Sequence, residues 1–190
     1  MSFEKQILKW YLNNKRDLPW RKNKDPYRVW ISEIILQQTR VSQGEKYFNN
    51  FIKKFPSVKI LASSGESEVL KIWKGLGYYN RAINIHKTSR EIVNTLNGVF
   101  PNTYDELIKL KGIGDYTASA ISSICFNEYN PVVDGNVLRF LARYYGLKIP
   151  VDSLKGQRDI KEIGKTLINK LDNPGDFNQA MMEFGALICT

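Results

Sequence analysis

The chain has 190 residues, of which 43% are hydrophobic, enough for one sizeable core or two small lobes. This composition excludes a disordered chain, and its two cysteines, Cys125 and Cys189, exclude a disulfide scaffold and are expected to stay reduced. The 28 Lys and Arg residues outnumber the 19 Asp and Glu residues, and a formal charge of +9 favours a polyanion such as nucleic acid as partner. Without a signal peptide, a membrane-spanning apolar run or a lipidation motif, the expected location is cytoplasmic, with no membrane partner.

Apolar residues recur at helical spacing along the whole chain, and no series of strands is predicted. The spacing predicts helices over 2–14, 26–38, 41–54, 58–63, 66–74 and 79–96 in the first half of the chain. Two later helices are predicted over 155–171 and 177–189, joined by the tripeptide 173–175. The only histidine, His86, is interpreted as a packing residue. The sequence therefore predicts an all-α fold.

A basic and aromatic loop separates the first two predicted helices. The segment KRDLPWRKNKDPYRVW contains two prolines and places Trp20 among the cationic residues Arg16, Arg21, Lys22 and Lys24. Loops of this kind commonly contact phosphates. The alternative is that these charged residues simply face solvent, and this segment taken alone favours that alternative.

Glu33 lies one position away from the apolar stripe of the predicted helix 26–38. A carboxyl group flanked by Trp30, Ile34 and Leu36 is expected to have a raised pKa, because burial disfavours its charged form. A glutamic acid that is protonated at neutral pH can act as a general acid. From this helix alone, an ordinary surface glutamate remains the alternative.

Two turns are candidates for contact with stacked bases. Gln37 and Gln38 end the predicted helix 26–38 and can hydrogen-bond base edges or face solvent. In WKGLGYYNRA, two glycines flank Leu76, which is expected on an exposed turn as a wedge between bases, with Tyr78 beside it as a stacking surface. The alternative is a helix C-cap at the first glycine, with Leu76 as its hydrophobic contact.

The central motif of the chain is LKGIGDYTASAISSIC, which begins at Leu110. Gly112 and Gly114 permit a tight turn between a helix that ends at Lys111 and a helix that begins at Asp115. This is the pattern of a helix-hairpin-helix. Its turn leaves backbone N–H groups at a helix N-terminus, which suits a phosphate. From the turn alone, a plain corner between two helices is the alternative.

Asp134 is expected at a helix N-terminus in PVVDGNVLRF, where aspartate is a preferred N-cap and the helix dipole favours its charged form. An ionised carboxylate can stabilise an oxocarbenium-like cation. A protonated Glu33 and an ionised Asp134 would therefore match the division between acid and stabiliser that glycosidic bond cleavage uses.

Several segments together resemble one known family. They are LPWR at 18, DPYRVWISEIILQQTRV at 25, FP at 55, WKGLGYYNRA at 73, LKGIGDYTASAI at 110, VVDGNVLRFLAR at 132 and FNQAMMEFGALICT at 177. In this order they resemble the catalytic region of the adenine DNA glycosylase (MutY) family, in the helix-hairpin-helix glycosylase superfamily that includes endonuclease III. The resemblance implies two helical lobes with the base pocket between them. One lobe is expected to comprise residues 1–24 and 135–190, and the other residues 25–134, a six-helix barrel with the hairpin at 105–125.

The resemblance also implies catalytic roles for individual residues. Glu33 matches the acid that protonates adenine, and Asp134 matches the carboxylate that stabilises the sugar cation, by charge or by transient covalent attachment. Tyr116 takes the position where bifunctional relatives keep a Schiff-base lysine. Because a phenol cannot form an imine, we expect release of the base without strand cleavage.

The resemblance further implies that the partner is double-stranded DNA that carries adenine opposite 8-oxoguanine or guanine. The protein is expected to bind it as a monomer, in the nucleoid of a bacterial cell. Base flipping is required, because the ring nitrogens are unreachable in a stacked duplex. The expected adenine-pocket residues are Trp20, Arg21, Leu36 and Asn136. The expected residues beside the opposing base are Gln38, Leu76 and Tyr78, and the other expected DNA contacts are Gln37, Thr39, Lys111, Gly112 and Gly114.

Two features depart from the family pattern. The family's [4Fe–4S] cluster uses four cysteines, of which Cys189 matches the first, and one thiolate cannot hold such a cluster, so no cofactor is expected in this chain as given. The family's C-terminal domain, which helps to recognise 8-oxoguanine, has no counterpart in the sequence. Weaker DNA affinity and poorer lesion discrimination are the expected consequences.

Two alternative functions stay open. A thymine glycosylase acting on G:T mismatches also uses a tyrosine near the hairpin, although Glu33 within SEIILQQT favours adenine, whose ring must be protonated by an acid. The other alternative is a DNA-binding module without catalytic activity.

Overall fold

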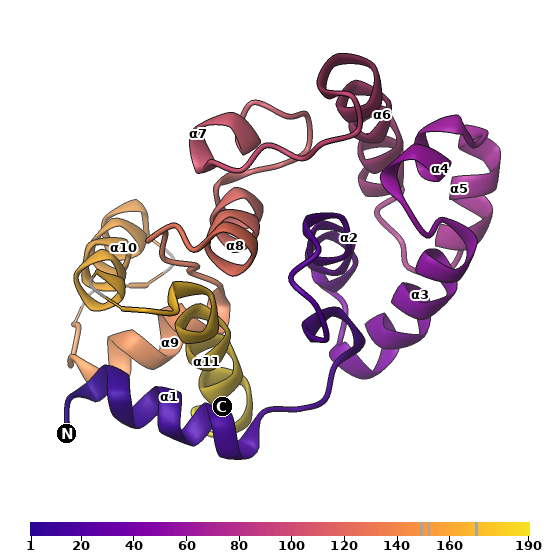
Figure 1. Ribbon diagram of the computed structural model, residues 1–190. Coiled ribbons are helices and arrows are strands. Elements are labelled where there is room, and N and C mark those ends of the chain that lie inside the picture. Colours follow the sequence, from indigo (N-terminus) through magenta and orange to yellow (C-terminus); the bar gives the residue numbers. More distant parts are fainter. Residues whose placement is uncertain (149, 152, 170) are drawn as a thin grey trace. The chain divides into compact units, whose positions relative to one another are not determined.

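The computed structural model describes residues 1–148, 150–151, 153–169 and 171–190. Within these ranges every regular element is helical, which confirms the predicted all-α fold. The elements, labelled in Figure 1, are α1 (Phe3–Asn14), η1 (Pro19–Arg21), α2 (Pro26–Leu36), α3 (Val41–Lys54), α4 (Val58–Ser63), α5 (Glu66–Trp73), α6 (Asn80–Leu96), α7 (Tyr104–Leu107), α8 (Asp115–Phe126), α9 (Gly135–Tyr144), α10 (Leu154–Ile168) and α11 (Pro174–Leu187). No helix in the described ranges combines the length and the apolarity that crossing a membrane requires.

The chain divides into two compact units. Unit 1 comprises Met1–Arg16 with Ser122–Thr190, and unit 2 comprises Asp17–Ile121, so that α8 crosses the boundary between them. We expected the boundaries after residues 24 and 134, and both observed boundaries come earlier in the chain. The second one is early because the C-terminal part of α8 packs within unit 1, where the Asn178 side-chain amide donates to the Ser123 hydroxyl at 2.8 Å.

Unit 2 is built around α2. Asp25 caps this helix by accepting from the Tyr27 N–H at 3.0 Å, and Pro26 occupies its first turn, as the sequence predicted. In Figure 1, α2 lies alongside α3, and α6 lies alongside α4 and α5. A helix that is apolar on nearly all faces is a buried helix. The buried side chains of α2 are Tyr27, Val29, Trp30, Ile31, Ser32, Glu33, Ile34 and Ile35.

Unit 1 joins the two ends of the chain. Helix α1 packs on α11, and α11 packs on α9. Just after α1, the Arg16 guanidinium forms a two-pronged contact with Glu183 of α11, with Nε–Oε1 at 2.8 Å and Nη2–Oε2 at 2.6 Å. This hydrogen bond raises the pKa of Arg16. The Glu183 side chain is only 1% exposed, and a buried carboxylate needs a paired partner, so this contact ties residue 16 to unit 1.

Three helix boundaries differ from the prediction by three residues or more. The first hairpin helix is the single turn α7, which ends at Leu107 and not at residue 111, and α10 ends at Ile168 and not at 171. Helix α11 begins at Pro174, so the expected connector 173–175 lies largely inside the helix, since proline is favoured in a first turn. A Cβ on Gly175 would lie 2.6 Å from the Cα of Ile124, so glycine permits the close approach of α11 to α8.

His86 has the packing role that the sequence predicted. Its side chain is 1% exposed, and its Nε2 lies 3.0 Å from the carbonyl oxygen of Ser64. This contact joins α6 to the end of α4.

Candidate active site

A buried carboxyl group in unit 2 has a tyrosine hydroxyl as its partner. Glu33 lies in the middle of α2 and is 7% exposed, and the Tyr116 hydroxyl donates to its Oε2 at 2.7 Å. Tyr116 is in the first turn of α8, directly after the hairpin turn, so the hairpin places this hydroxyl against α2. A protonated carboxyl group still has one oxygen that accepts, so the contact is compatible with an acid role for Glu33. The raised pKa expected for Glu33 stays a prediction.

A second carboxylate, in unit 1, is fixed at the start of α9. Asp134 is the N-cap, as predicted, and its Oδ1 accepts from the Val137 N–H at 2.8 Å. Its Oδ2 accepts from the side-chain amide of Asn136 at 2.7 Å. Both oxygens are therefore held, which orients the carboxylate.

The end of α11 supports Asn136 in turn. The Arg139 guanidinium donates to Asn136 Oδ1 at 3.1 Å and to the Gly185 carbonyl at 2.7 Å. A Cβ on Gly185 would lie only 2.7 Å from the Asn136 carbonyl oxygen. The orientation of Asp134 thus depends on the close packing of α9 and α11. Glu33 and Asp134 belong to different units, and the base pocket expected between the lobes stays a prediction.

The hairpin turn leads into α8 from the short helix α7. Gly112 has φ +78°, and a Cβ at this position would lie 2.8 Å from the Cβ of Asn84 in α6. Both observations require glycine here. Lys111 is exposed and its carbonyl oxygen accepts from the Thr88 hydroxyl, while Ile113 is buried beneath the turn.

We expect Lys111→Ala to make DNA binding less sensitive to salt. If the ammonium group neutralises one phosphate, the slope of log affinity against log salt should become shallower by about 0.9. The measurement is duplex affinity between low and physiological salt, with the exposed Lys46→Ala of α3 as control. An unchanged slope in Lys111→Ala would contradict the phosphate contact.

The glutamine turn after α2 has an unusual backbone. Gln38 is exposed and adopts φ +58°, a conformation that is uncommon for residues other than glycine. The turn is closed by the Thr39 N–H, which donates to the Leu36 carbonyl at 3.2 Å, and by the Thr39 hydroxyl, which donates to the Gln37 carbonyl at 3.4 Å. Gln38 is therefore presented outwards by a defined turn.

The glycine turn after α5 corrects one prediction. Leu76 is only 9% exposed, so the expectation that it stands on an exposed turn is wrong. Gly75 has φ +99° just after the helix, and Leu76 folds back inward, as in the alternative C-cap arrangement. Tyr78 is 66% exposed with φ +47°, so this turn presents the Tyr78 ring to solvent.

The aromatic part of the basic loop is buried. Trp20 is 7% exposed and packs edge-on against Phe48, with ring centroids 5.3 Å apart. Arg21 and Leu36 are half-buried. The adenine-pocket roles expected for these residues stay predictions.

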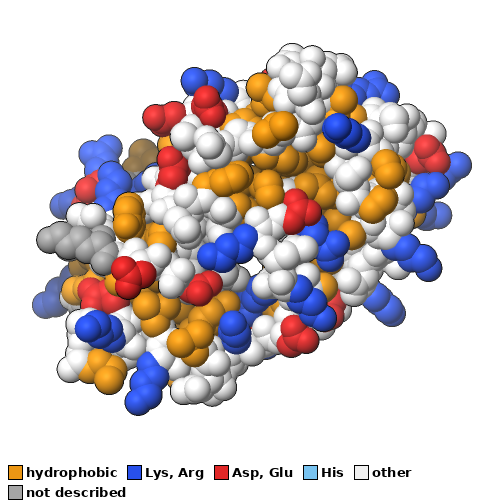
Figure 2. Space-filling view, viewed as in Figure 1, with side chains coloured by type: hydrophobic (Ala, Val, Ile, Leu, Met, Phe, Trp, Pro, Cys, Tyr) orange, Lys and Arg blue, Asp and Glu red, His pale blue; other side chains and the backbone are white. Residues whose placement is uncertain are grey.

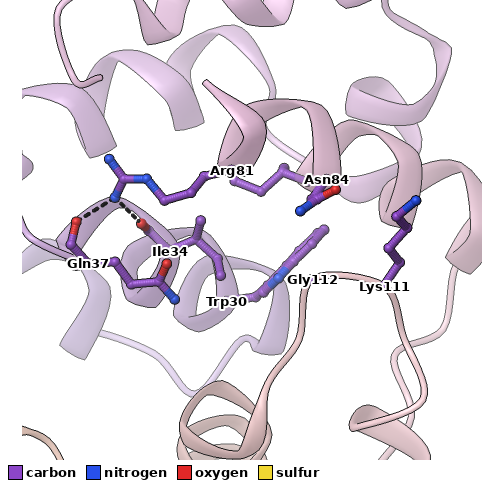
Figure 3. Close-up of a pocket in the computed structure, with 8 residues that line it drawn as sticks. Trp30, Ile34, Gln37, Arg81, Asn84, Lys111 and Gly112 are labelled. Atoms are coloured by element: carbon purple, nitrogen blue, oxygen red, sulfur yellow. Dashed lines mark hydrogen bonds between the residues drawn. The ribbon is translucent and has the colours of Figure 1, made fainter. Parts of the chain in front are cut away.

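Unit 2 contains a cavity of about 100 Å³, close to the hairpin turn (Figure 3). Its lining residues are Trp30, Ile34, Gln37, Arg81, Asn84, Ile85, Lys111 and Gly112. Glu33 is not part of the lining, so this cavity is distinct from the predicted catalytic carboxyl group.

Sequence reasoning missed Arg81, which contacts both of the turns expected to lie beside the opposing base. Its Nη1 donates to the carbonyl oxygens of Ile34 and Gln37 at 2.9 and 2.5 Å, drawn as dashed lines in Figure 3. Burial lowers the pKa of this guanidinium group. The sequence feature that could have identified Arg81 is its position in WKGLGYYNRA, three residues after Tyr78 and in the first turn of α6.

The helical fold and the glycine turn before α8 define a helix-hairpin-helix protein. The family described as HhH-GPD superfamily base excision DNA repair protein matches residues 31–167, and the chain belongs to this family. The chain is 46% identical over 188 residues to an adenine DNA glycosylase of Buchnera aphidicola subsp. Acyrthosiphon pisum, covering 98% of this chain and 53% of that protein. An adenine DNA glycosylase of Rattus norvegicus is 40% identical over 198 residues, covering 100% of this chain and 38% of that protein.

Among solved structures, a thermostable thymine-DNA glycosylase superposes with a TM-score of 0.88 at 29% identity, covering 99% of this chain and 86% of that one. These comparisons confirm the family resemblance inferred from the sequence motifs. The chain spans about half the length of the Buchnera relatives that it matches.

The residues present do not fit a [4Fe–4S] cluster, which takes four thiolate ligands. Cys189 supplies one sulfur, and its Sγ already lies 3.4 Å from Nη1 of Arg143. Over the residues that the structure describes, no three His, Cys, Asp or Glu side chains gather in a group that could hold a metal ion.

Proposed function

We propose that this protein is a monofunctional DNA glycosylase that hydrolyses the N-glycosidic bond of adenine opposite 8-oxoguanine or guanine. The observation that carries the proposal is the buried Glu33 carboxyl group held by the Tyr116 hydroxyl at the start of the hairpin's second helix. Its support from relatives is the 46% identity with an adenine DNA glycosylase across almost the whole chain.

In the proposed reaction, the Glu33 carboxyl group gives its proton to a ring nitrogen of the flipped adenine. The bond between the sugar C1′ and the base nitrogen then breaks, and its electron pair leaves with the base. Asp134 stabilises the resulting sugar cation with its negative charge. Water adds to C1′ and gives up a proton, which returns the acid to its starting state and leaves an abasic site.

The strand should stay intact because the position next to Glu33 holds a phenol and not an amine. Tyr116 cannot form an imine with the opened sugar, so this site supplies no Schiff base for strand cleavage. Its hydroxyl instead orients the Glu33 carboxyl group.

The partner in this proposal is duplex DNA. Lys and Arg side chains are spread over the face shown in Figure 2, with Asp and Glu among them. A net charge of +9 attracts a polyanion but does not mark one contact face. The exposed hairpin Lys111 and the exposed Gln38 and Tyr78 are the proposed contacts in unit 2.

A second candidate function is thymine removal from G:T mismatches. The observation in its favour is the TM-score of 0.88 with the thermostable thymine-DNA glycosylase. Against it stands Glu33, since adenine needs ring protonation and a buried carboxyl group can provide the proton.

Single-turnover base release from duplexes with 8-oxoguanine:A, G:A or G:T pairs tests these candidates. Each product is treated with and without alkali, which cuts the strand at an abasic site. We expect cleavage of the two adenine duplexes, and only after alkali. Cleavage of the G:T duplex alone would establish a thymine glycosylase instead. Binding without any release of a base would favour a DNA-binding module.

A further inference from the structure

One face of α6 contacts three turns of unit 2. Arg81, Asn84 and Thr88 occur at i, i+3 and i+7, a spacing that places them on one side of a helix. Arg81 reaches the end of α2 and the turn after α5, and Asn84 and Thr88 contact the hairpin turn. Figure 3 shows Arg81 and Asn84 on this face, with Lys111 and Gly112 of the hairpin turn beyond Asn84.

The Arg81 guanidinium closes the end of α2. Helix C-termini leave carbonyl groups without partners inside the helix. Nη1 of Arg81 donates to three carbonyls at this helix end, those of Ile34 at 2.9 Å, Ile35 at 3.4 Å and Gln37 at 2.5 Å. It thereby fixes the start of the turn that carries Gln38.

The same guanidinium also holds the glycine turn. Nη2 lies 3.4 Å from the carbonyl oxygens of both Leu76 and Gly77, and the guanidinium carbon lies 5.4 Å from the ring centroids of Trp73 and Tyr78. The Trp73 Nε1–H donates to Gly77 at 3.0 Å and closes the turn from its other side. One cation thus joins the two turns.

Each of these turns carries a residue other than glycine at positive φ, Gln38 at +58° and Tyr78 at +47°. Such conformations are sparsely populated for residues other than glycine and persist only where the surrounding structure imposes them. Arg81 contacts the backbone next to both residues, and each hydrogen bond of its guanidinium goes to a carbonyl oxygen. Its buried Nε makes no hydrogen bond.

We infer that Arg81 is a positioning residue that holds Gln38 and Tyr78 in one fixed arrangement for reading the base opposite adenine. This inference rests on the proposed function. The planar fork of arginine reaches both turns at once, whereas the single ammonium of lysine cannot replace two diverging sets of hydrogen bonds. Asn84 and Thr88 on the same face of α6 contact the hairpin turn, so α6 also fixes the two turns relative to the hairpin turn.

The test compares Arg81→Lys with Arg90→Lys, both on α6. Arg90 is exposed and also donates to carbonyl oxygens, those of Ala62 and Ser64, so it is a matched control. The first readout is the ratio of single-turnover adenine release from 8-oxoguanine:A and G:A duplexes. We expect this ratio to fall on the order of 10-fold in Arg81→Lys, because small displacements of positioning groups have effects of this size, and to stay unchanged in Arg90→Lys.

The second readout, which needs no activity, is amide hydrogen exchange at Thr39 and at Leu76, whose N–H groups donate to the carbonyl oxygens of Leu36 at 3.2 Å and Trp73 at 3.0 Å. Arg81→Lys should speed exchange at both positions together by about 10-fold, with an unchanged thermal midpoint. If Arg81→Lys does not fold, Arg81→Gln takes its place.

A folded variant that keeps the wild-type release ratio overturns the inference, as does faster exchange in only one turn or in neither. If the wild-type chain releases no adenine at all, the proposed function fails, and the exchange measurement alone decides whether Arg81 couples the two turns.

Discussion

Glu33→Gln is expected to slow single-turnover adenine release by about 10³-fold, the middle of the range that general acid catalysis supplies. Glutamine keeps the shape of the side chain, and its amide oxygen can still accept from the Tyr116 hydroxyl, which now donates to Oε2 at 2.7 Å. The substitution therefore removes the transferable proton and little else. Affinity for the mismatched duplex should stay within about twofold, because the proton is used only in the transition state.

The measurement is base release at saturating enzyme, with affinity determined separately on the same duplex. Glu91→Gln, at an exposed position of α6, is the matched control and should behave as wild type. Persistent activity in Glu33→Gln would remove the assigned acid role.

Asp134→Asn is expected to cost about 10²-fold or more in adenine release while costing less stability than Asp134→Ala. Asn and Asp are nearly equal N-caps, so the side-chain oxygen can continue to accept from the Val137 N–H. What disappears is the negative charge that stabilises the sugar cation, together with the hydrogen bond from the Asn136 amide to Oδ2, because an amide nitrogen at that position cannot accept. By contrast, Asp134→Ala loses the cap as well and should destabilise the fold by about 1 kcal/mol.

Thermal unfolding and single-turnover release on both variants separate the two roles of this residue. Equal loss of stability in Asp134→Asn and Asp134→Ala would show that the charge, and not the cap, supports the helix. Full activity in a folded Asp134→Asn protein would contradict the stabiliser role.

Local patterns were sufficient to predict several features. Asp25 followed by Pro26 predicted the start of α2, Asp134 was recognised as an N-cap, and the lone His86 was assigned to packing. Each of these depends on residues within a few positions along the chain or on helical periodicity. The hairpin turn could be predicted from Gly112 and Gly114 for the same reason.

Features that depend on distant residues were not predictable from such patterns. Arg81 makes hydrogen bonds to carbonyls that lie 44 and 47 residues earlier in the sequence, and nothing in its neighbourhood marks those partners. The direction of Leu76 was left with two readings, because two flanking glycines allow either an exposed or an inward side chain. The contact between Glu33 and Tyr116 spans 83 residues and was not predicted, because the family resemblance gave each residue a catalytic role without placing the two side by side.

The pairing of Arg16 with Glu183 bridges 167 residues of chain, and this bears on how the protein emerges from the ribosome. Unit 2 is one continuous segment, so its helices can find one another as soon as residue 121 has left the exit tunnel. Helix α1 is synthesised before unit 2 but must wait for α11 before Ile7 and Tyr11 can be covered. During that interval the apolar side of α1 is exposed, so the nascent chain needs protection from aggregation until α11 is complete.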